Sequence, residues 1–429
     1  MKKELARIKK FFNIFGPGVV TGAADDDPSG IATYTQTGAK FGYGQLWTAV
    51  AMLPLMVAIQ EACARIGAVT GHGLAAVIKA NYSKKVLYAA VLLVVVANTI
   101  NIGADIGAIA AAAQLIIPVN FVILTLGFTA VILILEIFTS YRVYSRILKW
   151  LALTLLAYPL TLFIINKPWK TILTATFLPH VELNFEFFFI ITAVLGTTIS
   201  PYMFFWQAAQ EVEEEKEQHL IGRYGKPKIG VKFIRNMRLD NFIGMVFSEF
   251  ATWSIIVVAA TVLHENGITN VESAADAAKA LEPLVQSFPH AGFLSKLIFA
   301  VGIIGLGLLG IPVLSGSAAY ALSEAFNMKE GLNLKLKKAH GFYGVITIAT
   351  LIGLMINFVG IDPIKALVFT AVFNGVAAVP LIFLIARIAR NKKIMGEYRS
   401  GWLSNIVVWI TFMVMLASAI AMFYTLAQG

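Results

Sequence analysis

The sequence predicts an all-α membrane protein that crosses the bilayer eleven times and contains two inverted repeats of five helices. Three observations support this fold class. Hydrophobic residues make up 58% of the 429 and charged residues only 14%, whereas about 25% charged is usual in soluble domains. Eleven apolar segments are long enough to span a bilayer, at about 20 residues each. The first and sixth segments are each interrupted by a proline, and such pairs are typical of transporters with inverted repeats.

The eleven segments are separated by polar connections. We expect them at 11–39, 45–67, 86–115, 120–140, 148–165, 187–211, 241–263, 291–323, 341–359, 364–389 and 403–426. Residues 1–165 form the first predicted repeat, 187–389 the second, and 403–426 an extra eleventh helix. Because each repeat holds an odd number of spans, the second is inverted relative to the first.

The basic residues alternate with the spans. All but six of the 34 lysines and arginines lie at the N-terminus or in every second connection, which is the positive-inside bias. This predicts a multi-pass protein of the cell membrane with a cytoplasmic N-terminus and an extracellular C-terminus. It also accounts for the net charge of +10, so we expect contact with lipid and no nucleic-acid partner. The single cysteine, Cys63, excludes a disulfide framework, and nothing in the sequence indicates an obligate protein partner.

The first interruption carries three adjacent carboxylates. Pro28 has no N–H group to donate, and its ring pushes Asp27 out of the helical region, so the helix cannot continue through Asp27-Pro28. We expect one half-helix to end at Ala24 and a second to follow from Ile31. Charged residues at bilayer depth are costly and indicate a functional site. Such broken backbone is tolerated only where it is buried in protein or lines a cavity. The second interruption, Thr197–Tyr202, contains Pro201 in the middle of the sixth segment. We therefore predict a substrate site between the two breaks.

The residues of the first break favour a cation. A carboxylate, freed backbone carbonyls and hydroxyl groups form a hard oxygen set that suits a divalent metal. Asp27 is nearest to the break. On a helical projection Asp26 and Asp25 lie about 100° and 200° away from it, so the three cannot all face one ion unless the helix is already unwound. Asp25 and Asp26 are expected to line the vestibule or to pair with polar groups.

At this point the sequence resembles the Nramp family of divalent-metal transporters. The matching stretches are Gly16–Gly18 (GPG), Asp27–Thr33 (DPSGIAT), Lys40–Tyr43 (KFGY), Ala64–Gly71 (ARIGAVTG) and Asn391–Glu397 (NKKIMGE). The resemblance implies the LeuT-type fold with metal bound between helices 1 and 6. Carried over by position, it also implies that the Asp27 carboxylate and the backbone carbonyls of Ala24 and Thr197 are ligands.

The departures from the family pattern concern two ligand positions. The family's Asp-Pro-Gly-Asn becomes Asp27-Pro28-Ser29-Gly30, so Gly30 stands where the family has a ligand asparagine. The family's Met-Pro-His becomes Ser200-Pro201-Tyr202, so a hydroxyl replaces a thioether. A glutamine of the family's tenth helix falls at Phe373 or Asn374, and the sequence leaves the register open.

These departures alter the expected metal. A thioether favours soft transition metals, whereas Mg²⁺ prefers oxygen and keeps several waters. An empty Gly30 position leaves room for water, and Ser200 supplies a possible oxygen ligand. The pattern resembles the Nramp-related magnesium transporters, and we expect transport of partly hydrated Mg²⁺ and also of Mn²⁺. Either ion is substrate, and no cofactor is predicted.

The positions that move protons in the family are also altered. Asn101 and Ala104 stand where its third helix has acidic residues, and Tyr202 and Gln207 stand where its sixth has histidines. None of these side chains titrates near neutral pH. We therefore expect uncoupled transport driven by the membrane potential. Asp105 lies one residue from the family position, where a buried acid could still carry a proton. We expect it instead to be an acid hydrogen-bonded to a neighbouring helix.

Several alternatives remain at the level of sequence. The nearest is a proton-coupled Mn²⁺/Fe²⁺ importer, against which the loss of the Met-His pair argues. A carrier of organic cations or amino acids with the same fold would need a larger unwound pocket. An integral-membrane enzyme would need a nucleophile–base pair or a metal cluster, and the sequence has neither pattern, so we expect no enzyme.

Overall fold

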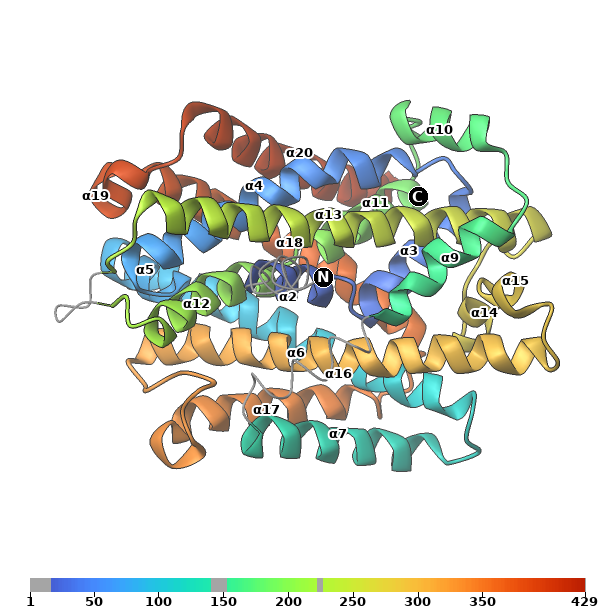
Figure 1. Cartoon of the computed structure of the whole chain (residues 1–429), viewed down its shortest axis with the longest axis horizontal. Coiled ribbons are helices and arrows are strands. Elements are labelled where there is room, and N and C mark those ends of the chain that lie inside the picture. Colours follow the sequence, from blue (N-terminus) through green and yellow to red (C-terminus); the bar gives the residue numbers. More distant parts are fainter. Residues whose placement is uncertain (1–16, 140–152, 222–226, 429) are drawn as a thin grey trace, which may run out of the picture.

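The computed structural model describes residues 17–139, 153–221 and 227–428, and these are helical apart from their connections (Figure 1). The helices that match the predicted spans are α2 (Pro17–Asp25) with α3 (Pro28–Phe41), α4 (Trp47–Thr70), α6 (Lys84–Gln114), α7 (Phe121–Phe138), α9 (Ala157–Ile164), α11 (Phe185–Thr198) with α12 (Pro201–Glu217), α13 (Val231–Val262), α16 (Ala291–Phe326), α17 (His340–Ile356), α18 (Pro363–Arg390) and α20 (Trp402–Gln428). Short helices fill the connections: α5 (Leu74–Asn81), η1 (Leu153–Leu156), α10 (Trp169–Phe177), η2 (His264–Asn266), α14 (Ala274–Lys279), α15 (Glu282–Val285), η3 (Leu336–Lys338), α19 (Lys392–Met395) and η4 (Gly396–Tyr398).

Each of the eleven predicted spans has a helical counterpart. Eight helical stretches of the described chain, counting α11 and α12 together as one, are long and apolar enough to cross a membrane. Two shorter apolar helices, Leu153–Ile164 and His340–Ile356, match the fifth and ninth predictions, and the α2–α3 pair matches the first. The predicted starts of the first and fifth spans, 11–16 and 148–152, lie outside the described residues.

The seventh span differs most from its prediction, because α13 begins at Val231 and not at 241. A span predicted from hydropathy ends where charged residues begin. A helix in the structure, however, continues for as long as its backbone hydrogen bonds can form. The added turns carry Lys232, Arg235 and Arg238. The Nε atom of Arg238 is 2.8 Å from Oε1 of Glu61 on α4, so this extension packs against the bundle.

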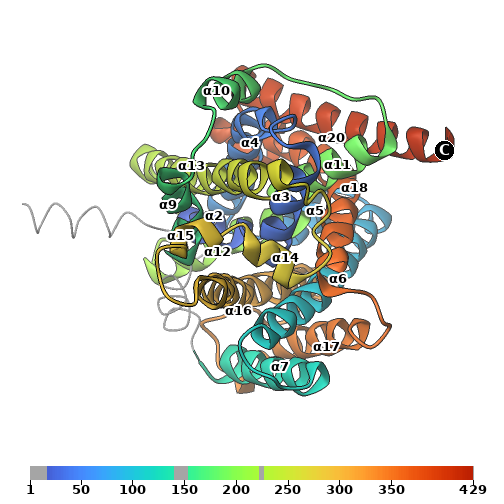
Figure 2. The same ribbon diagram turned by 90° about the vertical axis from the view of Figure 1, so that its right-hand side faces the viewer.

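The two broken spans lie near the middle of the bundle. In Figures 1 and 2, α2 and α3 lie between α13 on one side and α16 on the other. Helix α13 packs along both halves, α16 packs against α6, and α18 packs against α11. Gly22 makes the close approach of α2 to α13 possible, because a Cβ there would collide with the backbone of Gly244.

The outer helices expose large apolar side chains. Phe138 on α7 is 77% exposed and Met413 on α20 is 61% exposed, with further apolar residues beside them. Contiguous apolar surface of this kind marks contact with a membrane or with another apolar surface. The predicted contact with lipid therefore agrees with the observed faces of α7 and α20.

Candidate functional site

The two helix breaks face each other. Asp26 and Asp27 separate α2 from α3, and Ile199 and Ser200 separate α11 from α12. Three buried contacts join the two regions. The hydroxyl oxygens of Ser29 and Thr197 are 3.3 Å apart, and those of Tyr34 and Thr198 are 2.9 Å apart. The Tyr202 hydroxyl donates to the Ala24 carbonyl at 3.0 Å. The breaks predicted from sequence therefore form one polar region.

Asp27 lies at the centre of this region and is 1% exposed. Its backbone is extended, and Oδ1 caps α3 by accepting from the Gly30 N–H at 3.0 Å and from the Ser29 hydroxyl at 2.6 Å. Its Oδ2 accepts from the Asn101 amide of α6 at 3.1 Å. Asp is a favoured residue at this cap position, and Pro28 occupies the first helical position, where its missing N–H costs nothing. The sequence thus fixes the orientation of this carboxylate by local geometry.

The carbonyls predicted as ligands lie at the same break-to-break interface. That of Ala24 accepts from Tyr202, as described above. That of Thr197 accepts from the Ser200 hydroxyl at 2.8 Å, and Ser200 also contacts the Gly196 carbonyl at 2.6 Å. In this conformation the carbonyls are therefore satisfied within the protein, as buried backbone groups must be.

Gly30 also borders the region. A Cβ at this position would stand 3.2 Å from Cε2 of Tyr34, 3.3 Å from the Asp25 carbonyl oxygen and 3.5 Å from Oγ1 of Thr197. An aromatic ring and two oxygen atoms therefore already crowd the position of the missing asparagine side chain, so the room for water expected at Gly30 is not open in this conformation.

The other two acids of the triplet have different surroundings. The Asp25 carboxylate accepts from the Ser248 hydroxyl of α13 at 2.5 Å. Asp26 is 1% exposed, and its Oδ1 has no hydrogen-bond partner among the described residues. Among the described residues, no group of three or more His, Cys, Asp and Glu is arranged to hold a metal ion. The triplet is not a single cluster, and Asp25 pairs with a polar group, which was one of the two expectations for it.

Helix α18 presents Asn374 to the interior. Asn374 is 1% exposed, whereas its neighbour Phe373 is 37% exposed. Neither the amide oxygen nor the amide nitrogen of Asn374 has a hydrogen-bond partner among the described residues. Of the two residues, Asn374 and not Phe373 therefore faces the interior of the bundle.

The third-helix and sixth-helix positions discussed for proton movement are buried. Asn101 binds Asp27, and Ala104 is 2% exposed. Gln207 accepts from Thr21 at 2.5 Å and donates to Glu211 at 2.9 Å. Asp105 differs from expectation: neither of its oxygens has a hydrogen-bond partner in the described part of the chain, so it is not an acid bonded to a neighbouring helix.

Two partners of the site were not expected from sequence. Tyr202 was considered only as a replaced histidine, yet its hydroxyl holds a predicted ligand carbonyl. Ser29 joins Asp27 to Thr197. Each of them directly follows one of the two prolines, and this position could have indicated their role from sequence. Residues next to a helix break lie beside the backbone carbonyl and N–H groups that have no partner within the helix.

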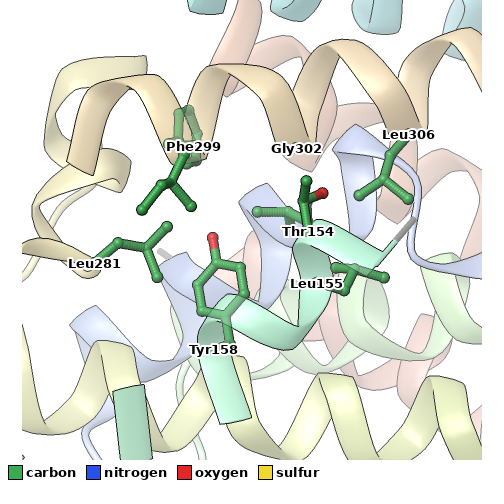
Figure 3. Close-up of a pocket in the computed structure, with 9 residues that line it drawn as sticks. Thr154, Leu155, Tyr158, Leu281, Phe299, Gly302 and Leu306 are labelled. Atoms are coloured by element: carbon green, nitrogen blue, oxygen red, sulfur yellow. The ribbon is translucent and has the colours of Figure 1, made fainter. Parts of the chain in front are cut away.

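Two further pockets lie away from Asp27. The pocket in Figure 3 is a cavity of about 10 Å³ lined by residues of α3, η1, α9 and α16 and by Leu281, where the Tyr158 side chain points from α9 toward α16. That space is enough for about one water molecule. A larger cavity of about 320 Å³ is lined by residues of α3, α11 and α18, and the Lys40–Glu186 ion pair (2.7 Å) lies in it.

A family model described as natural resistance-associated macrophage protein-like (Nramp) matches residues 18–425. The chain belongs to the Nramp family. Relatives of this Nramp protein include the divalent metal cation transporter MntH of Caldanaerobacter subterraneus subsp. tengcongensis, 25% identical over 98% of this chain and 94% of the relative. MntH of Klebsiella pneumoniae subsp. pneumoniae is 28% identical over 92% of this chain and 89% of the relative.

Solved structures support the same fold. The manganese transporter of Eremococcus coleocola superposes with a TM-score of 0.75 at 15% identity, covering 96% of this chain and 86% of that one. Mhp1, a nucleobase-cation-symport-1 family transporter, superposes with a TM-score of 0.60 at 13% identity, covering 97% and 93%. The predicted all-α, LeuT-type fold is confirmed, and this Nramp protein is a multi-pass membrane transporter and not an enzyme.

Proposed function

We propose that this Nramp protein carries divalent metal cations across the cell membrane, favouring partly hydrated Mg²⁺ and also accepting Mn²⁺. The observation that carries the proposal is the Asp27 carboxylate, which is buried at the first helix break and faces the second. A buried carboxylate without a basic partner needs either a proton or a cation to offset its charge. The curated relatives, named as divalent metal cation transporters, agree with a metal ion as substrate.

The proposed ligands are all oxygen atoms. They are the Asp27 carboxylate, the carbonyls of Ala24 and Thr197 and the Ser200 hydroxyl, at a break where Gly30 adds no side-chain ligand. Tyr202 and Ser200 now donate to those carbonyls, so we infer that the ion displaces these hydrogen bonds when it binds. Such a set favours hard ions, because Mg²⁺ binds through one or two carboxylates and retains waters.

We infer further that transport is not coupled to protons. Asn101, Ala104, Tyr202 and Gln207 offer no group that titrates near neutral pH. The positive-inside bias supports a cytoplasmic N-terminus and an extracellular C-terminus, with residues 1–165 and 187–389 as the two inverted repeats. The competing proposal is a proton-coupled Mn²⁺/Fe²⁺ importer, and the solved structure described as a manganese transporter agrees with Mn²⁺ as its metal.

The experiment is Mg²⁺ and Mn²⁺ flux into proteoliposomes for wild type and Asp27→Asn. Asparagine also caps helices well, so this variant removes the charge while keeping the oxygen that accepts from Gly30. Asp362→Asn is a matched control, because Asp362 precedes Pro363 and caps α18 in the same way, by accepting from Ile364 and Lys365. We expect Asp27→Asn to abolish both fluxes and Asp362→Asn to preserve them. Undiminished flux in Asp27→Asn would refute the site, and Mn²⁺ flux without Mg²⁺ flux would refute the selectivity.

A further inference from the structure

A second buried carboxylate faces Asp27 from α6. Asp105 is 0% exposed and lies one helical turn after Asn101, whose amide donates to Asp27. Residues four positions apart lie on the same face of a helix, so Asp105 and Asn101 present their side chains to the same region.

A glycine on α16 leaves the space between the two acids open. A Cβ at Gly310 would stand 3.1 Å from Cβ of Asp27 and 4.0 Å from Oδ2 of Asp105. Gly310 therefore places no side chain of its own between the two acids, which both border its backbone.

Asp105 has no partner that would explain its burial. Both of its oxygens lack a hydrogen-bond partner among the described residues. An unpaired buried carboxylate is costly unless it is neutralised, paired or coordinated to a metal. A divalent cation near Asp27 would offset both negative charges at once. By contrast, Asp25, the acid on the other side of the break, already accepts a hydrogen bond from Ser248.

We propose that Asp105 is a second acidic residue of the ion-binding site, which holds a partly hydrated divalent cation together with Asp27 across the bare backbone of Gly310. This inference rests on the proposed function. Asp105 acts on the water shell of the ion and so compensates for the missing asparagine at Gly30 and for the thioether that Ser200 replaces. Removal of an outer partner of a metal site typically costs about 10- to 100-fold in affinity, and we expect Asp105→Asn to weaken Mn²⁺ and Mg²⁺ binding by a factor in this range.

The test measures the Kd of Mn²⁺ and Mg²⁺ by calorimetry on the purified full chain, and thermal unfolding with and without metal. We expect Asp105→Asn to be at least as stable as wild type without metal, because the repulsion from Asp27 is gone, and to gain less stability when metal is added. Glu136→Gln is the control, since Glu136 is a buried acid of α7 that accepts from Ser315 at 2.6 Å. It should leave the metal-induced shift unchanged.

A second variant keeps both charges. Gly310→Ala places a methyl group between the two acids and should also weaken metal binding, whereas Gly292→Ala, which meets nothing within 4 Å, should not. Wild-type affinity in both Asp105→Asn and Gly310→Ala would overturn the inference. If all three variants, Asp27→Asn included, bind metal normally, the proposed function fails as well. If only Asp27→Asn loses metal binding, the inference about Asp105 fails but the proposed function stands.

Discussion

At the residue scale, the position and the chemistry of Asp27 both follow from the proline directly after it. The proline after it ends one helix and starts another, and the cap geometry directs one carboxylate oxygen along α3. The other oxygen remains available to Asn101 and to the region between the breaks. The cap itself is worth about 1 kcal/mol, and we infer that the same bonds preorganise the carboxylate for an ion.

Ser200 allows a direct test of ligand softness. It precedes Pro201 but makes no side-chain cap bond to α12, so its replacement removes no cap. We expect Ser200→Met to raise the affinity for Cd²⁺ and Mn²⁺ relative to Mg²⁺ by roughly tenfold or more, because a thioether favours softer ions. Competition between these ions in binding and flux assays measures the ratio. Ser200→Ala, which removes the hydroxyl without adding sulfur, is the control, and an equal change in both variants would contradict the softness argument.

From the sequence we could predict the role of residues when that role depends only on their neighbours in the chain. Pro28 and Pro201 specify the two breaks, and Asp27 is the acid adjacent to one of them. The sequence could not predict the partner of Ala24 or the orientation of Asp105, because these depend on how α6 and α12 approach α2 and α3. The burial of Asn374 and the exposure of Phe373 likewise depend on the packing of α18.

At the scale of elements, apolar length predicted every span, but span ends were less well defined. Helix α13 continues ten residues beyond the apolar stretch because solvated, charged side chains do not interrupt backbone hydrogen bonding. The connection after α16 is folded back in a way that sequence did not indicate. Glu330 in that connection lines a cavity of about 210 Å³ together with Glu213, Lys216 and Glu324.

The Glu330 carboxyl makes stability depend on pH. Burial, with the nearby Glu324 and Glu213 carboxylates, raises the pKa of Glu330 from 4.5 to about 9, although Lys216 opposes the shift. The folded protein therefore holds this proton more tightly than the unfolded chain. Its contribution to stability is complete below pH 4.5 and is lost as the pH rises toward about 9.

The matching experiment compares Glu330→Gln with wild type by thermal unfolding from pH 5 to pH 9. We expect equal midpoints at pH 5 and a higher midpoint for Glu330→Gln at pH 8 and above, because glutamine has no proton to lose. Glu272→Gln is a suitable control, since the Glu272 side chain is 66% exposed. A difference that does not vary with pH would contradict the assignment to Glu330.

At the scale of the whole molecule, acids lie inside and most basic residues lie in the connections. Asp27 and Asp105 are buried around the helix breaks, whereas the predicted positive-inside bias places lysine and arginine at one side of the membrane. If the proposed function is correct, the buried acids attract cations to the centre of the protein. The membrane potential is then the force that drives the cations across. Sequence alone could predict the charge distribution, but not which acids meet in space.

The last prediction concerns that driving force. Moving a divalent ion through 100 mV is worth about 4.6 kcal/mol, twice the single-charge value. Proteoliposomes with an inside-negative potassium diffusion potential of about this size should therefore accumulate Mn²⁺ or Mg²⁺ up to on the order of 10³-fold, since 1.4 kcal/mol corresponds to tenfold. A pH gradient imposed with the potential clamped at zero should drive no accumulation, and Asp27→Asn should accumulate neither ion. Accumulation driven by the pH gradient alone would instead establish the proton-coupled importer, because only an ion that moves with a proton can draw on that gradient.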